Sequence, residues 1–462
     1  MRSLSLQVAL LAVGRSNAHL SVLTLPNSPV SIVTLVSSRR RLGPICSTGY
    51  LMSWDKLVDK LYGLRRFGIK PGLKRILSAL GEEGNPDKAY EIVSVGGTNG
   101  KGTVASMIAA LLQAHGYRVG LYTSPHLIDV RERFRVDGQP LPQAEVEPVL
   151  EHVLAAYGGG EAVDGGKLTF FEVTTLVAAV VFADQEVDFA VFEVGLGGRL
   201  DAVNAMEPSL SVVTTIARDH TEYLGEELRD IAMEKAGIFR AGIPAVIGKQ
   251  DFEIARQTLL ETAEAVDAVA IETGAGDGES GFESIADRHR RTAEVAVQTL
   301  LDGPRMKGVN DQGFERWRWP GRFDVLDPWS GDRQLVLDAA HNRAGLQALA
   351  EHIRGYKNTI GAVIWTSMRE KDPGDIESFF EELGVGVWAS LVKNERCRSS
   401  DELQGFVPRR WWRGSGTTQD VLRRVRGGEE GDVLIFGSVF LLGEVFEALG
   451  WRVSELVTYV ED

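Results

Sequence analysis

The chain has 462 residues, enough for two or three domains, and its 44% hydrophobic and 25% charged residues are typical of a globular protein. A net charge of −14 argues against a general nucleic-acid-binding protein, and no apolar stretch reaches the roughly 20 residues of a membrane helix. The two cysteines, Cys46 and Cys397, show neither metal-ligand spacing nor a disulfide framework, so a reducing, cytoplasmic setting is expected.

The first 51 residues differ from the rest, because they contain no Asp, Glu or Lys. Five arginines stand among many Ser, Leu and Val residues, a composition typical of a transit peptide. Three interpretations stay open: a start codon assigned too far upstream, a cleaved segment that targets an organelle, and a functional tail. An amphipathic stretch opens at Met52, which favours this residue as the true start.

Residues 96–103, a glycine-rich loop, are the most informative stretch of the chain. Residues 91–95 form a short apolar run typical of a buried strand, and apolar residues recur at helical spacing over 104–112. Residues 118–123 indicate another strand. A glycine-rich loop between a strand and a helix is the context that a phosphate-binding loop needs.

The loop residues carry the chemistry of nucleotide binding. Lys101 can reach the β- and γ-phosphates of ATP, and the Thr103 hydroxyl can bind Mg²⁺. The strict phosphate-loop spacing is not met, because Val95 replaces the first glycine and Gly102 separates Lys101 from Thr103. A plain glycine turn is the alternative. The predicted ATP-binding residues here are Gly97, Thr98, Asn99, Gly100, Lys101, Gly102 and Thr103.

Strand-like and helix-like segments alternate from Met52 to about residue 320. Strands are expected over 187–194, 210–216 and 244–247, a helix over 226–239, and a surface loop over 272–282. This alternation predicts an α/β domain, residues 52–320, with a mostly parallel sheet of the phosphate-loop type.

A second α/β unit is expected from Gly321 to the end, residues 321–462. Strands are predicted over 334–337, 361–365, 387–391 and 432–436, and a helix over 346–353. The unit reads as a smaller, Rossmann-like domain.

Several long motifs follow one another in order: 96–103, Thr123 to Leu127, 131–138, 169–174, 193–204, 219–225 and 234–238. Together they closely resemble the dihydrofolate synthase/folylpolyglutamate synthase family of the Mur ligase superfamily, from about Met52 to the C-terminus. The resemblance implies an ATP-dependent ligase in which a carboxylate becomes an acyl phosphate that the amino group of L-glutamate attacks. Its substrates would be dihydropteroate, reduced folates or both.

By this resemblance, Thr103, Glu193 and His220 bind Mg²⁺, and Lys101 and His220 take part in catalysis. The residue types agree, since each follows a predicted strand, where ligands gather in open α/β sheets. A surface carboxylate and a structural histidine are the alternatives for Glu193 and His220.

Lys235 is implied to act in catalysis, carbamylated by CO₂ into a carboxylate-like metal ligand; a monovalent cation is also implied. From the sequence alone, the pair Glu234-Lys235 within a helix indicates a solvated face.

The resemblance places Ser124, Pro125, His126 and Arg133 in the loop that contacts the pterin substrate. A solvated charged loop is the alternative for the arginine. Further substrate contacts are implied for Phe171 and Glu172, an aromatic face beside an acid, and for Asp201, whose alternative is a helix N-cap.

In the second unit, Arg322, Asp338 and His341 match nucleotide contacts of the family, and a guanidinium suits phosphate binding. The chain also departs from the family pattern: Ala339 replaces a glycine, Arg343 a proline and Ala293 an asparagine.

The sequence thus predicts a monomeric ligase with small-molecule substrates and no nucleic-acid or membrane partner. Other Mur-type amino-acid ligases and a non-catalytic nucleotide-binding relative are the alternatives. One activity or two, the length of the glutamate chain and the preferred folate stay open.

Overall fold

The computed structural model describes residues 20–22, 33–35, 52–64, 70–159, 166–274, 284–301, 312–330, 332–428 and 430–459. Residues 1–51 and 52–462 are separate compact units. In the first, strand β1 (Leu20–Val22) pairs antiparallel with β2 (Val33–Leu35). The interpretations of the N-terminal segment rest mainly on residues outside the described ranges.

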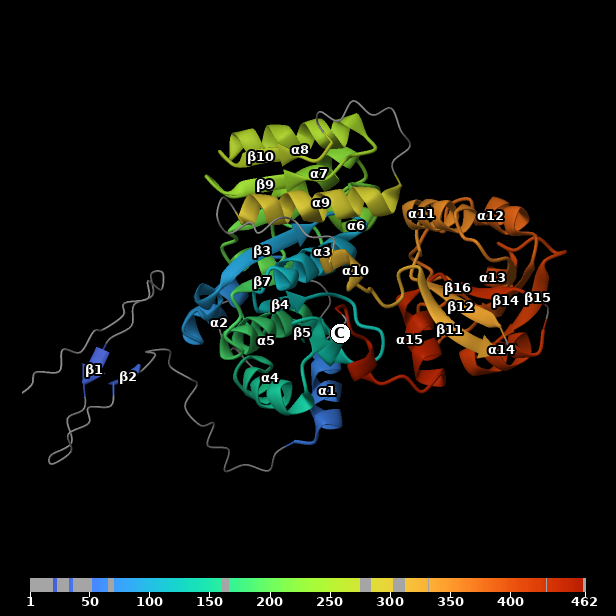
Figure 1. Cartoon of the computed structure of the whole chain (residues 1–462), viewed down its shortest axis with the longest axis horizontal. Helices are drawn as coiled ribbons and strands as arrows, with labels where there is room; N and C mark the ends of the chain where they lie inside the picture. The colour runs from blue at the N-terminus through green and yellow to red at the C-terminus, as the bar shows by residue number, and fades with distance from the viewer. Residues whose placement is uncertain are drawn as a thin grey trace, which may run out of the picture. The chain divides into compact units, whose positions relative to one another are not determined.

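The larger unit begins with an α/β region around an eight-stranded sheet of order β10-β9-β8-β3-β7-β4-β5-β6 (Figure 1). The strands from β10 to β4 run parallel, and β5 and β6 are antiparallel to their neighbours. Their bounds are β3 Glu91–Gly96, β4 Val119–Tyr122, β5 Phe134–Val136, β6 Gln139–Pro140, β7 Phe189–Glu193, β8 Leu210–Val213, β9 Pro244–Ile247 and β10 Val269–Glu272.

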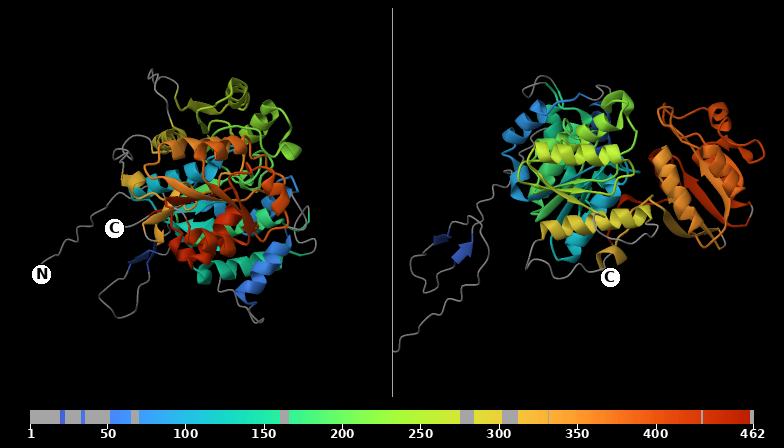
Figure 2. Two further views of the ribbon diagram at one scale, coloured as in Figure 1. Left: turned by 90° about the vertical axis from the view of Figure 1, so that its right-hand side faces the viewer. Right: turned by 90° about the horizontal axis from the view of Figure 1, so that it is seen from above.

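Helices cover both faces of this sheet (Figure 2). Alternate strand residues face alternate layers: Ile92 of β3 belongs to the core cluster that includes residues of α1, α2, α4, α5, α7 and α8, whereas Val93 belongs to the cluster with α3, α9 and α10. The helices are α1 Trp54–Gly63, α2 Lys74–Glu82, α3 Lys101–Ala114, α4 Gln143–Tyr157, α5 Phe170–Asp184, α6 Thr221–Leu224, α7 Leu228–Ala236, α8 Glu253–Ala265, α9 Ile285–Leu300 and α10 Gln312–Glu315, with 3₁₀ turns at Pro86–Ala89, Val130–Arg133 and Ala202–Ala205.

The second α/β region surrounds a six-stranded sheet of order β11-β12-β16-β13-β14-β15. All neighbours pair parallel except β11 and β12. The strands are β11 Asp324–Ser330, β12 Arg333–Asp338, β13 Ile360–Trp365, β14 Gly386–Ser390, β15 Trp412–Gly416 and β16 Asp432–Phe436.

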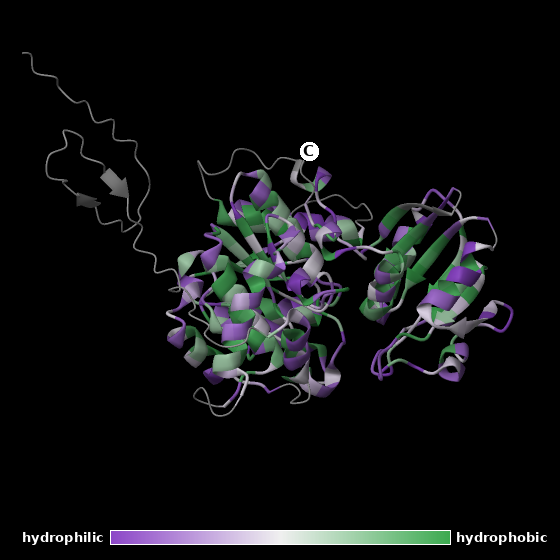
Figure 3. Ribbon diagram, turned by 90° about the horizontal axis from the view of Figure 1, so that it is seen from below, coloured by the Kyte–Doolittle hydropathy of each residue, from purple (hydrophilic) through white to green (hydrophobic). Residues whose placement is uncertain are grey.

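This sheet is also covered on both faces, and its strands are among the most hydrophobic segments in Figure 3. Helices α11 (Arg343–Arg354), α12 (Ile376–Leu383) and α13 (Ser400–Gln404) pack on one face around Trp365 and Phe436. Helices α14 (Thr418–Arg426) and α15 (Val439–Ala448) pack on the other around Leu335 and Ile435.

Two chain segments lie side by side where these regions meet. The backbone of Trp317, just before the second sheet, forms an antiparallel bridge with Tyr459, near the end of the chain. The Arg318 N–H donates to the Thr458 carbonyl at 3.0 Å, and the Thr458 N–H donates back to Gly138 of the first region at 2.9 Å. The C-terminal segment, after the 3₁₀ turn Val453–Glu455, therefore returns to the first region.

The α/β fold with two parallel-sheet regions confirms the predicted fold class. The expected strands over 244–247 and 432–436 have those bounds, while the helix expected over 226–239 is shorter, ending at Ala236 before Gly237. The surface loop expected over 272–282 begins with the last residue of β10, and residues 275–283 lie outside the described ranges. Among the described residues, no helix has both the length and the apolar character to cross a membrane.

Candidate functional site

The loop between β3 and α3 is fixed by its glycines and by contacts with the segment that follows β8. Gly97 has φ +134° and Gly100 φ +78°, both favoured by glycine. A Cβ on Gly97 would collide with the Thr214 side chain, whose hydroxyl donates to the Asn99 carbonyl at 2.7 Å. The Thr98 hydroxyl exchanges hydrogen bonds with the backbone of Ala217 at 3.0 and 3.1 Å. These contacts fix the loop before any ligand arrives.

This loop also has the electrostatics of an anion site. Gly100 is the N-cap of α3, and no side chain of the described residues caps the helix, so its first N–H groups are available to an anion. The Lys101 ammonium donates to the Thr98 carbonyl at 3.2 Å, on the same loop. The ring of His289, from α9, lies where a Cβ of Gly100 would stand.

Glu193, the last residue of β7, is buried beside the loop. Its Oε2 accepts a hydrogen bond from the Ser124 N–H at 2.8 Å. Burial raises the pKa of this carboxyl, while Lys101 acts in the opposite direction. A Cβ on Gly102 would lie 3.1 Å from the Trp319 ring and 3.3 Å from Glu193 Oε2, so this glycine lets both approach the start of α3.

His220 follows β8 and faces a cation from the second region. Lys371 Nζ lies 3.4 Å from His220 Nε2 and 3.0 Å from Asp219 Oδ1. Burial and the charge of Lys371 lower the pKa of His220, which favours the neutral imidazole. Burial acts to raise the pKa of Asp219, but the charge and hydrogen bond of Lys371 outweigh it and the value is about 2.

Lys235 lies on α7 with its side chain buried, and Nζ donates to the Gly97 carbonyl at 2.8 Å. Burial, followed by repulsion from Lys101, lowers its pKa to about 7. The interpretation of the Glu234-Lys235 pair as a solvated face is therefore wrong for the lysine. A helix pattern cannot reveal this, because α7 ends against the phosphate loop instead of facing solvent.

The second region brings Arg322 and His341 to the same place. Arg322 follows Gly321, which has φ +73°, and it is half-buried. The His341 Nδ1 lies 2.8 Å from the Ala339 carbonyl, and burial with the charge of Lys371 lowers its pKa to about 4. Because a carbonyl only accepts, Nδ1 carries the proton and Nε2 is left as an acceptor.

One pocket of about 190 Å³ gathers most of the predicted site residues. It lies where the loops after parallel strands β3, β7 and β8 meet, as open α/β sheets lead one to expect. Its lining from the first region includes Gly97, Thr98, Asn99, Gly100, Lys101, Gly102, Thr103, Ser124, Pro125, Glu193, Asp219, His220 and Lys235, and from the second region Arg322 and His341.

Asp338 is not among the residues that line this pocket. Its carboxylate accepts from the Ala340 N–H at 2.7 Å and the Phe323 N–H at 2.8 Å. The buried acid thus ties the end of β12 to the segment that carries Arg322.

His126 and Arg133 form a second cluster, with aromatic partners from α1 and α5. The Tyr62 hydroxyl lies 2.8 Å from His126 Nε2, and Arg133 Nε donates to His126 Nδ1 at 2.9 Å. Arg133 Cζ lies 5.1 Å from the centre of the Phe170 ring, on which the Tyr62 ring stacks. Arg133 is buried, and its Nη1 has no partner among the described residues, so the solvated-loop alternative does not hold for it.

Phe171, Glu172 and Asp201 are not among the residues that line the pocket, although Phe171 and Asp201 contact Gly195, which does. The Phe171 ring packs where a Cβ of Gly195 would stand. Glu172 closes a capping box at the start of α5 with Thr169 and pairs with Arg75 at 3.0 Å. Asp201 accepts from three backbone N–H groups, those of Gly195, Leu196 and Val203, at 2.9–3.1 Å. The N-cap alternative for Asp201 is thus present in the structure.

The sequence analysis missed three residues near the pocket. Asp219 was not predicted to bind a cation, and Lys371 and Asn342 were not predicted to be near the site. Asn342 caps α11 through Oδ1, and its Nδ2 donates to Asn99 Oδ1 at 3.1 Å and Asp219 Oδ2 at 3.4 Å. The signal for Asn342 was its place beside His341 after a predicted strand. For Lys371 the sequence offers little, because a lysine in a loop is ordinarily solvated.

Within the described ranges, no group of three His, Cys, Asp or Glu side chains is arranged to hold a metal ion. The predicted set has one carboxylate, one imidazole and one hydroxyl, from Glu193, His220 and Thr103. That set fits Mg²⁺ poorly as a closed protein cage, but well as a site completed by water and substrate phosphates, the usual arrangement for this ion.

Comparison with known proteins adds independent findings. Residues 95–305 match the family model of the Mur ligase middle domain. The dihydrofolate synthase/folylpolyglutamate synthase of Haemophilus influenzae is 40% identical to this chain over 88% of it and 99% of the relative. Probable bifunctional folylpolyglutamate synthase/dihydropteroate synthases of Halobacterium salinarum and Haloferax volcanii are 33% and 31% identical, but the chain spans about half their length, 51% and 50%.

Solved structures are similar over nearly their whole length. Escherichia coli FolC in complex with DHPP and ADP gives a TM-score of 0.72 at 26% identity, covering 85% of this chain and 97% of that one. A bifunctional folylpolyglutamate synthase/dihydrofolate synthase with Mn, AMPPNP and L-glutamate bound also gives 0.72, at 29% identity, covering 85% and 98%.

Proposed function

Since the chain belongs to the dihydrofolate synthase/folylpolyglutamate synthase family, we propose that it is an ATP-dependent ligase that joins L-glutamate to dihydropteroate, to reduced folates or to both. The observation that carries the proposal is the single pocket in which Lys101, Glu193 and Lys235 meet Arg322 and His341. Phosphate-binding groups of one region and polar groups of the other thus line one space, as a reaction between a nucleotide and two further substrates requires.

The phosphate loop is proposed to hold the ATP phosphates. The uncapped N-terminus of α3 supplies N–H donors, and Lys101 and Arg322 supply charge for phosphoryl transfer to the substrate carboxylate. The carboxylate oxygen attacks the γ-phosphorus, ADP leaves, and the resulting acyl phosphate is attacked by the neutral amine of L-glutamate. Inorganic phosphate then leaves as the amide forms.

Mg²⁺ is proposed to bind at Thr103, Glu193 and His220, where it would offset phosphate charge. The neutral state favoured for His220 suits a ligand, since the imidazole lone pair must be free. Relatives solved with AMPPNP and Mn or with ADP support a nucleotide and a divalent ion. A monovalent cation stays a prediction.

Carbamylation of Lys235 is proposed because its amine is buried and has a lowered pKa. CO₂ adds to a neutral amine, and burial with a pKa of about 7 provides that form at neutral pH. Substituting Lys235 by Ala should abolish most turnover, and a short carboxylic acid such as acetate should restore part of it. Full activity without Lys235 would contradict the role; loss of activity without rescue would leave a lysine function but no carbamate.

The pterin substrate is proposed to use Ser124, Pro125 and the cluster of His126 with Arg133. The unpartnered Nη1 of Arg133 is a buried donor of the kind that a ligand acceptor satisfies. Phe171, Glu172 and Asp201 are proposed to shape that pocket from its walls. His341 is proposed to contact the nucleotide. Asp338 is proposed to act indirectly, because it holds the segment that carries Arg322.

The decisive experiment measures phosphate release from ATP by the full chain with Mg²⁺, L-glutamate and either dihydropteroate or tetrahydrofolate, with mass detection of products. Product from dihydropteroate alone defines a dihydrofolate synthase, from tetrahydrofolate alone a folylpolyglutamate synthase, and from both a bifunctional enzyme. Turnover that neither substrate raises above the ATP-only background would refute the proposal.

A lysine pair provides the control. Removing the Lys101 charge should lower turnover by roughly 10²–10³-fold, the usual cost of losing one group that stabilises transition-state charge. Lys393→Ala, at an exposed lysine of the second region, should leave turnover unchanged. A monomeric, cytoplasmic enzyme remains our expectation, which gel filtration and fractionation test.

A further inference from the structure

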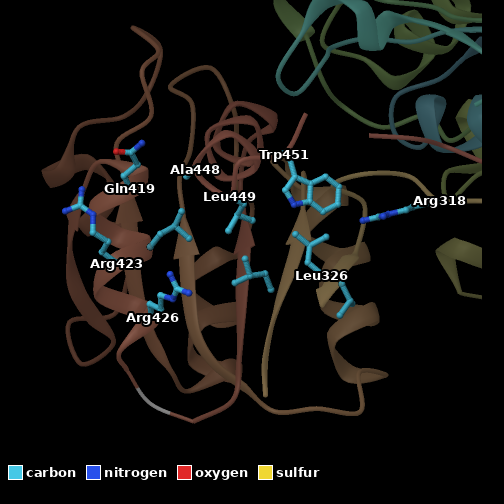
Figure 4. A pocket seen from close by; sticks show the side chains of 11 residues that line it. Arg318, Leu326, Gln419, Arg423, Arg426, Ala448, Leu449 and Trp451 are labelled. Carbon is cyan, nitrogen blue, oxygen red and sulfur yellow. The ribbon is translucent and has the colours of Figure 1, made fainter. Parts of the chain in front are cut away.

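A second, larger pocket lies in the second region, lined by residues different from those of the nucleotide pocket. Its volume is about 750 Å³, within the range of sites that bind small molecules. Figure 4 shows the side chains that line it. They come from the segment before the sheet, from β11 and β12, and from α14 and α15: Arg318, Val325, Leu326, Leu335, Gln419, Leu422, Arg423, Arg426, Ala448, Leu449 and Trp451.

The inner end of this groove is apolar, with Leu326 and Leu335 buried at 7% and 0% exposure and Val325 37% exposed beside them. Helix α14 contacts β13, β14 and β15, and α15 contacts β16. Leu326 and Leu335, which are register partners on β11 and β12, belong to the core cluster that packs with those helices and also line the groove. Leu449 and Trp451 add partly exposed apolar surface after α15. An aromatic or aliphatic body would bury this surface.

Three of the four polar side chains that line the groove are arginines, and the fourth is Gln419. Arg318 lies at one end of the view in Figure 4, and Arg423 and Arg426 lie at the other. Arg318 Cζ stands 5.2 Å from the centre of the Trp451 ring. The described lining contains no Asp or Glu, although the neighbours Asp324 and Asp420 pair with Arg318 and Arg423 at 3.3 and 3.4 Å. Arg423 keeps 74% of its side chain exposed, so its charge remains open to a ligand.

We propose that this groove is a second ligand site, separate from the nucleotide pocket, that binds an aromatic molecule carrying carboxylate groups. The apolar inner end takes the ring, and the guanidinium groups take the carboxylates, for which their planar fork is suited. A concave pocket favours a small molecule over a protein partner, because protein interfaces are flatter and wider. The proposal goes beyond the ligase reaction and does not depend on it.

The test is calorimetric binding of 4-aminobenzoyl-L-glutamate, which has one ring and two carboxylates, to the full chain saturated with AMPPNP and Mg²⁺. Arg423→Gln with Arg426→Gln should weaken binding at least tenfold, since both charged donors are lost. Arg410→Gln, an exposed arginine of the same region paired with Glu381, should bind as wild type does. Arg318 is left unchanged, because its partner Asp324 also accepts from Gly321, beside Arg322.

A second variant and two probes make the outcome unambiguous. Ala448→Trp fills the groove without changing charge and should also weaken binding, while an unchanged thermal midpoint shows that the fold is intact. The neutral analogue 4-aminobenzamide should bind at least tenfold more weakly. Equal affinity in wild type and both groove variants would overturn the site, and binding of AMP in place of the dicarboxylate would overturn the carboxylate assignment.

Discussion

Burial gives Lys235 a chemistry that surface lysines lack. Its ammonium has the Gly97 carbonyl as a partner at 2.8 Å, and its pKa falls to about 7 from the ordinary 10.5. Near neutral pH the folded protein thus holds this amine partly neutral, whereas the unfolded chain holds it charged. The difference in bound protons makes stability depend on pH.

The first prediction concerns this linkage. Between pH 7 and about 10 the unfolded state binds the extra proton, so raising the pH favours the folded state. The unfolding free energy of wild type minus that of Lys235→Met should therefore rise with pH, by up to about 1.4 kcal/mol per unit. Urea unfolding of both proteins in CO₂-free buffer at pH 7, 8 and 9 measures the slope. If this difference in unfolding free energy stays flat or falls with pH, the pKa of Lys235 is not lowered in the folded protein.

At the residue scale, the sequence could predict which side chains carry the chemistry of the site but not which groups surround them. Lys101, Glu193 and Lys235 were placed by motif, and the structure brings them to one pocket. The sequence analysis gave backbone capping as the alternative role of Asp201, but it did not predict that Glu172 accepts from the Thr169 N–H. For Glu172 a local signal existed, since Thr169 and Glu172 have the spacing of a capping box.

The phosphate loop is the element on which the nucleotide proposal rests. Its Gly100 has φ +78°, and a Cβ on it would collide with Nε2 of the His289 ring. The N-cap of helix α3 is therefore a residue that favours glycine, both because of its backbone conformation and because of this contact.

The second prediction separates those two reasons. Gly100→Ala should weaken ATP binding at least tenfold, because the new methyl group must displace His289 or the loop. Gly116→Ala is the matched control: it has φ +87° at the other end of the same helix, with nothing within 4 Å of its Cβ. Both variants should lose roughly 1 kcal/mol of unfolding free energy from backbone strain.

Binding of AMPPNP by calorimetry and urea unfolding distinguish the two variants. His289→Ala should relieve the binding defect of Gly100→Ala, since it removes the colliding ring. If both glycine variants lose ATP affinity equally, strain alone explains the effect and the contact with His289 has no role.

At the element scale, strong apolar runs were predicted well and weak ones were missed. Strands β3, β9 and β16 are nearly continuous buried runs, which a sequence pattern reveals. Strand β15 was not predicted because its residues, Trp-Arg-Gly-Ser-Gly, form no apolar run. Strand β6 was not predicted because it has only two residues. These strands exist because neighbouring strands pair with them.

The contacts between the two sheet-containing regions belong to the scale of the whole molecule. Lys371 reaches Asp219 at 3.0 Å, and the two side chains are 13% and 16% exposed. Asn342 adds a hydrogen bond to Asn99 of the phosphate loop. These polar contacts link the loop after β13 and the start of α11 to the loops of the first sheet.

The third prediction tests this ion pair. Lys371→Met should destabilise the protein more than the double change with Asp219→Asn, because the single change leaves a poorly solvated carboxylate without its partner. The coupling in such a cycle should be of the order of 1–3 kcal/mol. Additive effects in urea unfolding would mean that the pair is solvated and loose.

The same variants report on the site. Lys371→Met should also lower turnover with L-glutamate, since the cation faces His220 in the pocket. No sequence pattern could indicate this pair, because its members stand 152 positions apart and meet only through the arrangement of the two sheets.

The paired segments at Trp317 and Tyr459 make a ribbon of two adjacent backbones between the regions. A single connecting segment would allow the two regions to rotate relative to each other in every direction. Two paired segments bend easily in the direction perpendicular to the plane that contains them. They resist bending within that plane and sliding past each other. Opening and closing of the nucleotide pocket should therefore follow one preferred arc, and a cut in either strand would convert a guided motion into an undirected one.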